Sequence, residues 1–375
     1  MDKKLTVLKD GTVFTKDCTF AKMNVCFADG EIISLTEDVP GGAEVIGCED
    51  LYVLPGLTDV HLHGCAGQDL SEASQESLAA MADFEYRHGV TAFCPAVMTL
   101  PDGEISRILR GAAEYAKNAP ADTAEIAGIN LEGPFVSAEK CGAQNAAYIA
   151  SPSAEKLRKW QSGAGGLIKL VTIAPELSGA VGCIRECAGE FRFSLGHTAC
   201  DYDTAMAAFA AGADHVTHLF NAMPAFHHRD AGLIGAAFDT AGCFAELICD
   251  GVHVCASAVR AAFKLFGDDR IVLISDSMEA AGMPDGEYML GGQKVIKRGS
   301  RAELEDGTLA GSVSTLYDCL RKAAEFGIPL ESAVKAATRN PCLSAGLYDE
   351  IGSIEPGKKA RFLILRRDLT IKTVI

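Results

Sequence analysis

The chain has 375 residues, of which 48% are hydrophobic and 22% charged, so it can bury a sizeable core and lacks the composition of a disordered protein. Its formal net charge is -16 and its isoelectric point is near 5.0, which gives a negative field that repels polyanions. Nucleic acid and anionic membrane surfaces are therefore excluded as expected partners, and an anionic small molecule needs a local cationic pocket.

The opening segment, MDKKLTVLKDGTVFTKD, has no uninterrupted apolar stretch of the kind found in a signal peptide. No later run reaches the roughly 18 charge-free apolar residues of a membrane span. The fourteen cysteines are scattered and include no CxxC pair, which favours reduced thiols over disulfides or a thiolate metal site. We therefore expect a cytoplasmic protein.

Short strand-like runs separated by turn residues fill the first part of the chain and return near its end. The first runs are KLTVLKDG, VFTKDCTF, KMNVCFADG, EIISLTED and AEVIGCED, and several contain Asp-Gly or other turn residues between them. After Pro341, the segment IGSIEPGKKARFLILRRDLTIKTVI predicts further strands and a turn at Pro356 and Gly357. We expect residues 1–54 and 343–375 to build one small β-sandwich domain together.

Between residues 55 and 342, apolar runs alternate with amphipathic helical stretches, which predicts a parallel sheet of βα units. The candidate strands are LTDVHLH, VTAFCPAVM, IAGINLEG, IKLVTIAP, RFSLGHT, DHVTHLF, CFAELICDG and RIVLISDS, with helices expected at 72–88, 153–161, 202–211 and 257–266. Such a sheet closes at about eight strands. The predicted fold class is therefore α/β, a (β/α)8 TIM-type barrel, with a β excursion over its mouth at residues 281–309.

Polar residues end most of the candidate strands, and active sites of such barrels lie at the carboxyl ends of strands. These residues are His61 and His63, Glu132, His197, His218, Asp250 and His253, and Asp276. Because residues two apart on a strand share a face, we expect His61 and His63 to point into the barrel, and Val60 and Leu62 outward. Imidazole and carboxylate donors from separate strands predict a first-row divalent metal, zinc or iron.

The run IVLISDSM is an apolar strand that ends abruptly in a carboxylate, Asp276. Beside a metal-activated water, this carboxylate can accept a proton and return it to a leaving group. The alternative is that Asp276 caps the next helix. The remaining histidines, His88, His215, His227 and His228, are interpreted as structural, with His88 at a helix end where it can pair with free carbonyls.

The motifs PGLTDVHLHG, LEGPFV, LGHT, THLFNAMP, CDGVHV and ISDSM resemble, in order and spacing, those of the N-acetylglucosamine-6-phosphate deacetylases of the amidohydrolase superfamily. The resemblance runs over essentially the whole chain. HxH marks the superfamily broadly, whereas LEGPF with THLFNAMP is more specific to the deacetylases. The resemblance implies the same barrel with a small β-sandwich, and one or two divalent ions as cofactor.

The resemblance also implies roles for single residues. It assigns a principal metal site to Glu132, His197 and His218, a second one to His61 and His63 with Glu132 as the bridge, and acid-base catalysis to Asp276. It assigns substrate contacts to Asn221 and Ala222 at the sugar phosphate, to His253 at the sugar, and to Gln144, where many members have histidine. It further implies that Arg229 reaches the phosphate bound by a neighbouring subunit, and hence a homodimer.

The expected reaction is hydrolysis of the acetamide of N-acetylglucosamine 6-phosphate to glucosamine 6-phosphate and acetate. A second possibility is an amidohydrolase acting on another N-acyl or a cyclic amide. A third is an inactive barrel kept as a scaffold, which should have lost metal ligands or the general base. All six of these positions are present in the sequence, which argues against the scaffold.

Overall fold

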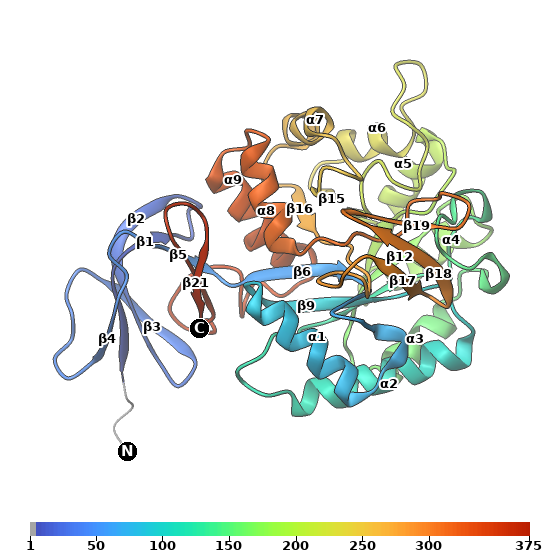
Figure 1. Ribbon diagram of the computed structural model, residues 1–375. Coiled ribbons are helices and arrows are strands. Elements are labelled where there is room, and N and C mark those ends of the chain that lie inside the picture. Colours follow the sequence, from blue (N-terminus) through green and yellow to red (C-terminus); the bar gives the residue numbers. More distant parts are fainter. Residues whose placement is uncertain (1–4) are drawn as a thin grey trace.

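A computed structural model describes residues 5–375 and shows a barrel beside a small β domain (Figure 1). The barrel strands lie where the sequence predicts them: β6 (Leu57–Leu62), β9 (Val90–Val97), β11 (Ile129–Glu132), β12 (Ile168–Ile173), β13 (Arg192–Leu195), β14 (His215–Val216), β15 (Phe244–Ile248) and β16 (Ile271–Ile274). Each pairs in parallel with the next in this order. The predicted fold class is confirmed.

The last barrel strand meets the first at its carboxyl end. The Asp276 N–H donates to the His61 carbonyl at 2.9 Å, and the His63 N–H donates to the Ser277 carbonyl at 2.7 Å. The buried Asp59 carboxylate accepts the Ser275 N–H at 3.3 Å. This closure places Asp276 directly beside the two histidines.

Helices follow the strands and pack on the outside of the barrel (Figure 1). They are α1 (Gln75–Arg87), α2 (Asp102–Asn118), α3 (Ala154–Gly163), α4 (Ala180–Cys187), α5 (Tyr202–Ala211), α6 (Gly232–Asp239), α7 (Ala256–Phe266), α8 (Leu316–Glu325), α9 (Leu330–Ala337) and α10 (Arg339–Ser344). The four predicted helices are confirmed as α1, α3, α5 and α7. Side chains of Ser74, Ser153 and Asp201 cap three of them by accepting backbone N–H bonds. Within residues 5–375, no helix has the length and apolarity needed to cross a bilayer.

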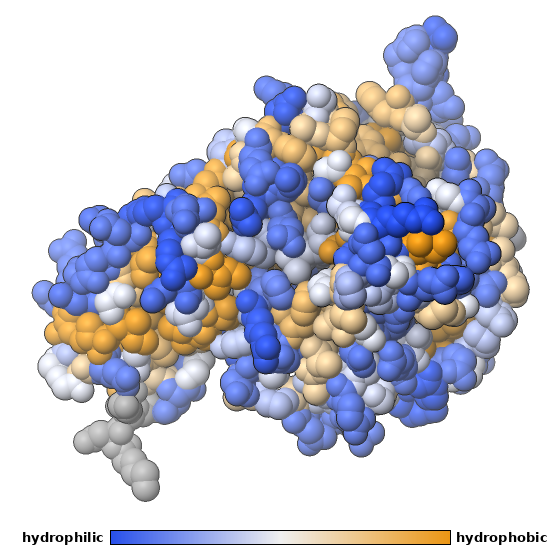
Figure 2. Space-filling model, in the orientation of Figure 1, coloured by the Kyte–Doolittle hydropathy of each residue, from blue (hydrophilic) through white to orange (hydrophobic). Residues whose placement is uncertain are grey.

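Strands from both ends of the chain form one sheet: β1 (Thr6–Phe14), β2 (Phe20–Ala28), β3 (Glu31–Thr36), β4 (Glu44–Gly47), β5 (Tyr52–Pro55), β20 (Phe362–Leu365) and β21 (Ile371–Val374). Leu8, Val25 and Phe362 belong to its own apolar core. Figure 2 shows apolar surface over the region of β3 and β4, where Ile33 and Val45 are exposed. The proposed boundaries after residue 54 and before residue 343 stay a prediction.

Two expectations for the first strands are wrong. Strand β1 does not turn at Asp10 and Gly11 but continues through them, with a register shift against β2 between Leu8 and Gly11. This is a β-bulge in which Asp10 has a φ of 59° and its N–H donates to the Asn24 side chain. The run VFTKDCTF is the end of β1, a turn and the start of β2. Lys4, which begins the first run, lies outside the described residues.

Strand β6 also departs from simple alternation. Leu62 packs in the core against the helices, as expected, but Val60 packs in a separate cluster with Cys94 and Leu170. The register of β6 against β9 shifts between Asp59 and Leu62. The outward orientation expected for Val60 is therefore wrong, because the irregularity changes which side chains share a face.

The predicted β excursion is confirmed as a three-stranded antiparallel flap, β17 (Gly286–Leu290), β18 (Gln293–Arg298) and β19 (Arg301–Leu304). It lies across the barrel end in Figure 1. Its apolar residues Leu290 and Val295 pack in one cluster with Met98, which directly follows β9. The short strands β7 (Gly64–Cys65), β8 (Gln68–Asp69) and β10 (Glu125–Ile126) complete the sheets.

Candidate active site

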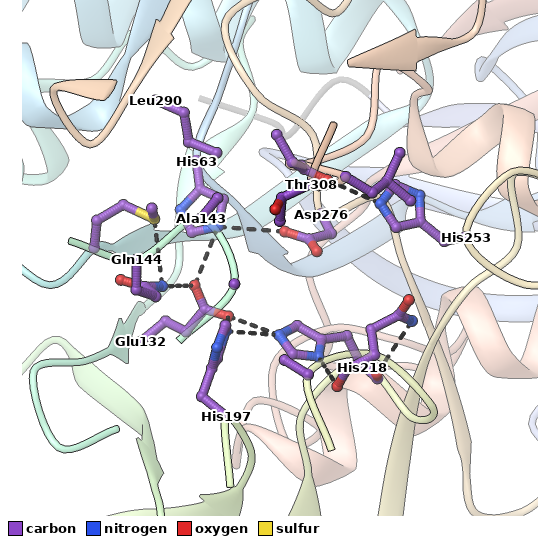
Figure 3. A pocket seen from close by; sticks show the side chains of 17 residues that line it. His63, Glu132, Ala143, Gln144, His197, His218, His253, Asp276, Leu290 and Thr308 are labelled. Atoms are coloured by element: carbon purple, nitrogen blue, oxygen red, sulfur yellow. Dashed lines mark hydrogen bonds and ion pairs between the residues drawn. The ribbon is translucent and has the colours of Figure 1, made fainter. Parts of the chain in front are cut away.

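Glu132, the last residue of β11, lies at the centre of the predicted site (Figure 3). Its Oε1 atom lies 3.0 Å from His197 Nε2 and 2.9 Å from His218 Nε2. These two residues follow β13 and β14, respectively. Glu132, His197 and His218 therefore meet in space, with ligand atoms close enough to share one ion.

The histidines of β6 approach the same carboxylate from the other side. His61 Nε2 lies 3.3 Å from Glu132 Oε1, and His63 Nε2 lies 3.2 Å from Glu132 Oε2. All three side chains are buried, and their ligand atoms form a second group that could hold an ion. Glu132 belongs to both groups, so it has the position of a bridge.

The Nδ1 atoms of the four imidazoles all face acceptors. His61 Nδ1 lies 2.9 Å from Glu246 Oε2, and the Nδ1 atoms of His63, His197 and His218 lie 3.2, 3.0 and 3.2 Å from backbone carbonyls. Each Nδ1 is therefore positioned to donate to its acceptor, and each ring turns Nε2 toward the centre of the site.

The orientation of these rings fits a divalent cation. His197 Nε2 and His218 Nε2 are only 3.1 Å apart, and His61 Nε2 is buried without a hydrogen-bond partner. Nitrogen lone pairs that face one another repel unless a proton or a cation lies between them. The donor set of imidazoles and a carboxylate is one that zinc and iron prefer.

The imidazoles and carboxylates of this site shift one another's pKa values. Burial lowers the pKa of His63, but hydrogen bonds to Asp276 and Glu132 outweigh it and raise the pKa to about 10. Burial raises the pKa of Glu132, but His61 and His197 outweigh it and hold the pKa well below its usual range. The carboxylates therefore favour the protonated form of His63, and the imidazoles favour the ionised form of Glu132.

Asp276 lies next to the second group. Its Oδ1 atom lies 3.3 Å from His63 Nε2 and 3.7 Å from His61 Nε2. Burial raises the pKa of Asp276, but His61 and His63 outweigh it and lower the pKa, so the carboxylate is ionised and can accept a proton. In the described chain the next helix, α8, begins forty residues later and is capped by Thr315, so Asp276 is not a helix cap.

Strained backbone turns several of these side chains toward the mouth. His197, His218 and Asp276 have φ values of 46°, 29° and 48°, in the left-handed region. Non-glycine residues rarely adopt this region, and each costs about 1–3 kcal/mol, so surrounding packing must hold them there. Gly133 has a φ of 120°, and a Cβ atom there would lie 2.2 Å from Thr99 Oγ1, so the turn after Glu132 needs glycine.

The residues assigned to substrate, except for Arg229, line one cavity of about 250 Å³ together with His63, Glu132, His197 and His218. Asn221, Ala222 and His253 lie at its partly exposed side. The two ring nitrogens of His253 face Asp250 Oδ2 at 2.7 Å and the Ala310 carbonyl at 2.9 Å. These contacts hold the ring at the rim of the cavity.

Gln144 lies deeper in the cavity than a substrate contact alone requires. Its Nε2 donates to Glu132 Oε2 at 2.7 Å, and its Oε1 accepts the Thr99 N–H at 2.7 Å. Both ends of the amide are thus engaged by the protein. The structure brings Gln144 to Glu132, and its assigned contact with substrate stays a prediction.

Arg229 lies away from this cavity, on the exposed loop between β14 and α6 that projects from the barrel in Figure 1. Its guanidinium contacts the neighbouring His228 ring at 2.8 Å. Among residues 5–375, no lysine or arginine lines the cavity.

Glu246 is a buried residue that the sequence interpretation missed. Its Oε2 atom accepts from His61 Nδ1 at 2.9 Å and from the His218 N–H at 3.2 Å. His215 Nε2 lies 3.4 Å from its Oε1. A carboxylate in the middle of the apolar run CFAELICDG was the available signal, but it does not end the strand.

The structural interpretation of His88 agrees with its Nδ1 contact to the Phe84 carbonyl at the end of α1.

Comparison with known proteins places the chain in a family. Residues 52–375 match the Amidohydrolase family model. An N-acetylglucosamine-6-phosphate deacetylase from Bacillus subtilis is 38% identical over 97% of this chain and 94% of its own length. An N-acetylgalactosamine-6-phosphate deacetylase from Escherichia coli O157:H7 is 31% identical over 98% of this chain and 97% of its own length.

A solved structure agrees with these relatives. A mutant N-acetyl-D-glucosamine-6-phosphate deacetylase from Mycobacterium smegmatis, in complex with N-acetyl-D-glucosamine-6-phosphate, superposes with a TM-score of 0.92 at 30% identity, covering 99% of this chain and 98% of that one. The resemblance to the deacetylases is thus confirmed over nearly the whole length. The chain belongs to the amidohydrolase family.

Proposed function

We propose that this protein is a metal-dependent hydrolase that removes the acetyl group of N-acetylglucosamine 6-phosphate, giving glucosamine 6-phosphate and acetate. The observation that carries the proposal is Glu132 surrounded by four imidazole Nε2 atoms, with the Asp276 carboxylate alongside in the same cavity. The names and extent of the relatives support this substrate class. A cyclic amide substrate and an inactive scaffold have no comparable support.

Glu132, His197 and His218 would hold the principal ion, and His61 and His63 a second one that shares Glu132. A bound zinc or iron ion supplies Lewis acidity toward water and toward the acetamide carbonyl. The Nδ1 contacts of the imidazoles fix the rings so that Nε2 faces the ion. Glu246 and Gln144 restrain the two ligands that they contact, His61 and Glu132.

Asp276 performs the proton transfers. As the water oxygen attacks the acyl carbon, Asp276 accepts the proton, and it then donates this proton to the amine nitrogen as the C–N bond breaks. Its lowered pKa means that it starts in the base form. His253, at the other side of the cavity, binds the sugar, and Asn221 and Ala222 contribute to binding of the phosphosugar.

A phosphate is well bound by lysine or arginine, and among residues 5–375 neither lines the cavity of a single chain. The exposure of Arg229, and of Phe226 (51%) on the same projecting loop, supports a role for Arg229 in the cavity of a second copy. A guanidinium binds phosphate through paired N–H donors. We therefore include in the proposal a homodimer in which Arg229 acts across the interface.

All fourteen cysteines are free thiols, which supports a reducing compartment such as the cytoplasm.

The test measures acetate release from N-acetylglucosamine 6-phosphate, N-acetylgalactosamine 6-phosphate and unphosphorylated N-acetylglucosamine by protein of known metal content. We expect the highest kcat/KM with the first, and a sharp loss without phosphate because remote binding energy contributes to turnover. Faster turnover of the galactosamine compound would replace the proposed substrate with its epimer. No acetate release from any of the three by metal-loaded protein would refute the function.

A further inference from the structure

The two ends of the active-site cavity differ in polarity and in closure. In Figure 3, Leu290 and Gln144 lie at the end near Glu132 and His63, whereas His253 lies at the other end, beyond Asp276. At the first end, Leu290 is 2% exposed and Met98 is 4% exposed. At the second, His253 and Asn221 are only partly buried. The first end is thus closed by apolar side chains behind the proposed ligands, and the other end is open and polar.

The flap closes the apolar end. Leu290 ends β17 and packs with Met98 in one apolar cluster, which Ala143 joins from its edge. A Cβ atom on Gly291 would lie 3.1 Å from Met98 Cε, so the flap backbone rests on the Met98 side chain. The Gln293 side chain donates to the Ala143 carbonyl at 2.5 Å and fixes the flap to the opposite loop.

A single side chain, Gln144, separates Met98 from the Glu132 carboxylate. Gln144 Nε2 contacts Glu132 Oε2 at 2.7 Å and lies 3.5 Å from Met98 Sδ. The scissile C–N bond of the substrate joins an acyl group to an amino sugar. When this bond lies beside Asp276, the acyl group must point to one end of the cavity and the sugar to the other. A hydrated, anionic phosphosugar fits only the open polar end, because burying its charge against Met98 and Leu290 is costly.

We propose that Met98 and Leu290, with Ala143, form an acyl-binding wall that limits the substrate to short N-acyl groups. This inference rests on the proposed deacetylase function and adds to it the determinant of acyl length. The cavity volume of about 250 Å³ is below the roughly 300–1,000 Å³ of most small-molecule sites, which supports a short acyl group.

The experiment compares kcat/KM for the N-acetyl, N-propionyl and N-butyryl derivatives of glucosamine 6-phosphate. We expect the metal-loaded protein to lose about tenfold or more with each added methylene. In Leu290→Ala and Met98→Ala, the ratio of butyryl to acetyl turnover should rise about tenfold or more, because the truncated side chain leaves space. Leu290→Val, which removes a single methylene, keeps the test available if the larger truncations do not fold, and should shift the ratio in the same direction by less.

Val295→Ala is the matched control. Val295 is fully buried in the same flap cluster but does not line the cavity, so its truncation should leave the acyl ratio unchanged. An unchanged ratio of butyryl to acetyl turnover in the Leu290 and Met98 variants would overturn the proposed acyl-binding wall. An equal shift of this ratio in Val295→Ala would also overturn it. Failure of the unaltered protein to release acetate would instead overturn the proposed function.

Discussion

The barrel mouth and the terminal β-sheet bury very different side chains. The core of the sheet consists of apolar residues such as Leu8, Val25 and Phe362. At the mouth, the fully buried positions include His61 and Glu246, both without exposed surface. Burying charged groups costs free energy unless they are paired or bind a ligand, so the mouth is arranged for chemistry and the sheet for stability.

The difference also appears in the backbone. At the mouth, His197, His218 and Asp276 hold left-handed φ angles at the ends of strands. In the sheet, the left-handed Asp10 lies in a β-bulge with its N–H satisfied by Asn24. Unusual backbone in the sheet therefore serves strand pairing, and at the mouth it orients the proposed active-site residues. Variants in the two regions should accordingly change different properties.

The largest effect is expected for Asp276→Asn. An amide cannot accept the proton of the attacking water, so kcat should fall by about three orders of magnitude or more. Asparagine keeps the shape of the side chain, so the metal content, measured by plasma mass spectrometry, should stay as in the unaltered protein. A kcat of D276N close to that of the unaltered protein, at equal metal content, would contradict the assigned role.

Ion binding should depend steeply on pH. The pKa of His63 is raised from 6.5 to about 10 without an ion, so the ring holds a proton at neutral pH that an ion must displace. Apparent affinity should therefore rise with pH up to about 10, by about tenfold per unit for each proton released. The same shift stabilises ion-free protein below pH 6.5, a contribution that is lost as pH rises through about 10. Calorimetry of zinc binding in two buffers of different ionisation enthalpy measures the protons, and affinity independent of pH would argue against this picture.

Glu246→Gln should have a smaller effect. Loss of the carboxyl group behind His61 reduces the basicity of that proposed ligand, and we expect the ion affinity to fall by about 10- to 100-fold. Glu85→Gln is the matched control, because burial raises the pKa of Glu85 to about 8, which leaves it neutral at pH 7, and it does not contact a proposed ligand. Equal affinities of the two variants for zinc would show that Glu246 has no special role.

The smallest effect on catalysis is expected for Phe362→Ala in the terminal sheet. Phe362 is fully buried and packs edge-on against Phe27 at 5.4 Å between ring centroids. Its truncation should cost about 3–5 kcal/mol of unfolding free energy but leave kcat unchanged. Denaturant unfolding and turnover, measured on the same sample, separate the two quantities. A large loss of kcat in folded protein would mean that the two regions are coupled.

The sequence predicted those parts of the molecule that depend on regular periodicity. The eight barrel strands and the polar residues at their ends follow from apolar runs that stop abruptly, and the structure brings Glu132, His61, His197 and Asp276 together. The irregular parts were missed. An Asp-Gly pair has the same local signal in a bulge as in a turn, so Asp10 was misinterpreted.

Glu246 and the surroundings of Gln144 needed the three-dimensional structure. Glu246 lies mid-strand, so no rule about strand ends selects it, and its partners His61 and His218 are far away in sequence. Gln144 lies in a loop, and its contact with Glu132 depends on the path that the chain takes between these two residues. Long-range pairing of buried polar groups leaves no periodic pattern in a single sequence.

The central claim is that Glu132, His197 and His218 hold a divalent ion that the reaction requires. Anomalous diffraction from crystals of the active protein, recorded at the absorption edge of the metal found in solution, tests it most directly. We expect a peak about 2.0–2.2 Å from Glu132 oxygen and from both histidine Nε2 atoms. A fully active protein whose metal lies elsewhere, or which binds none, would contradict the account.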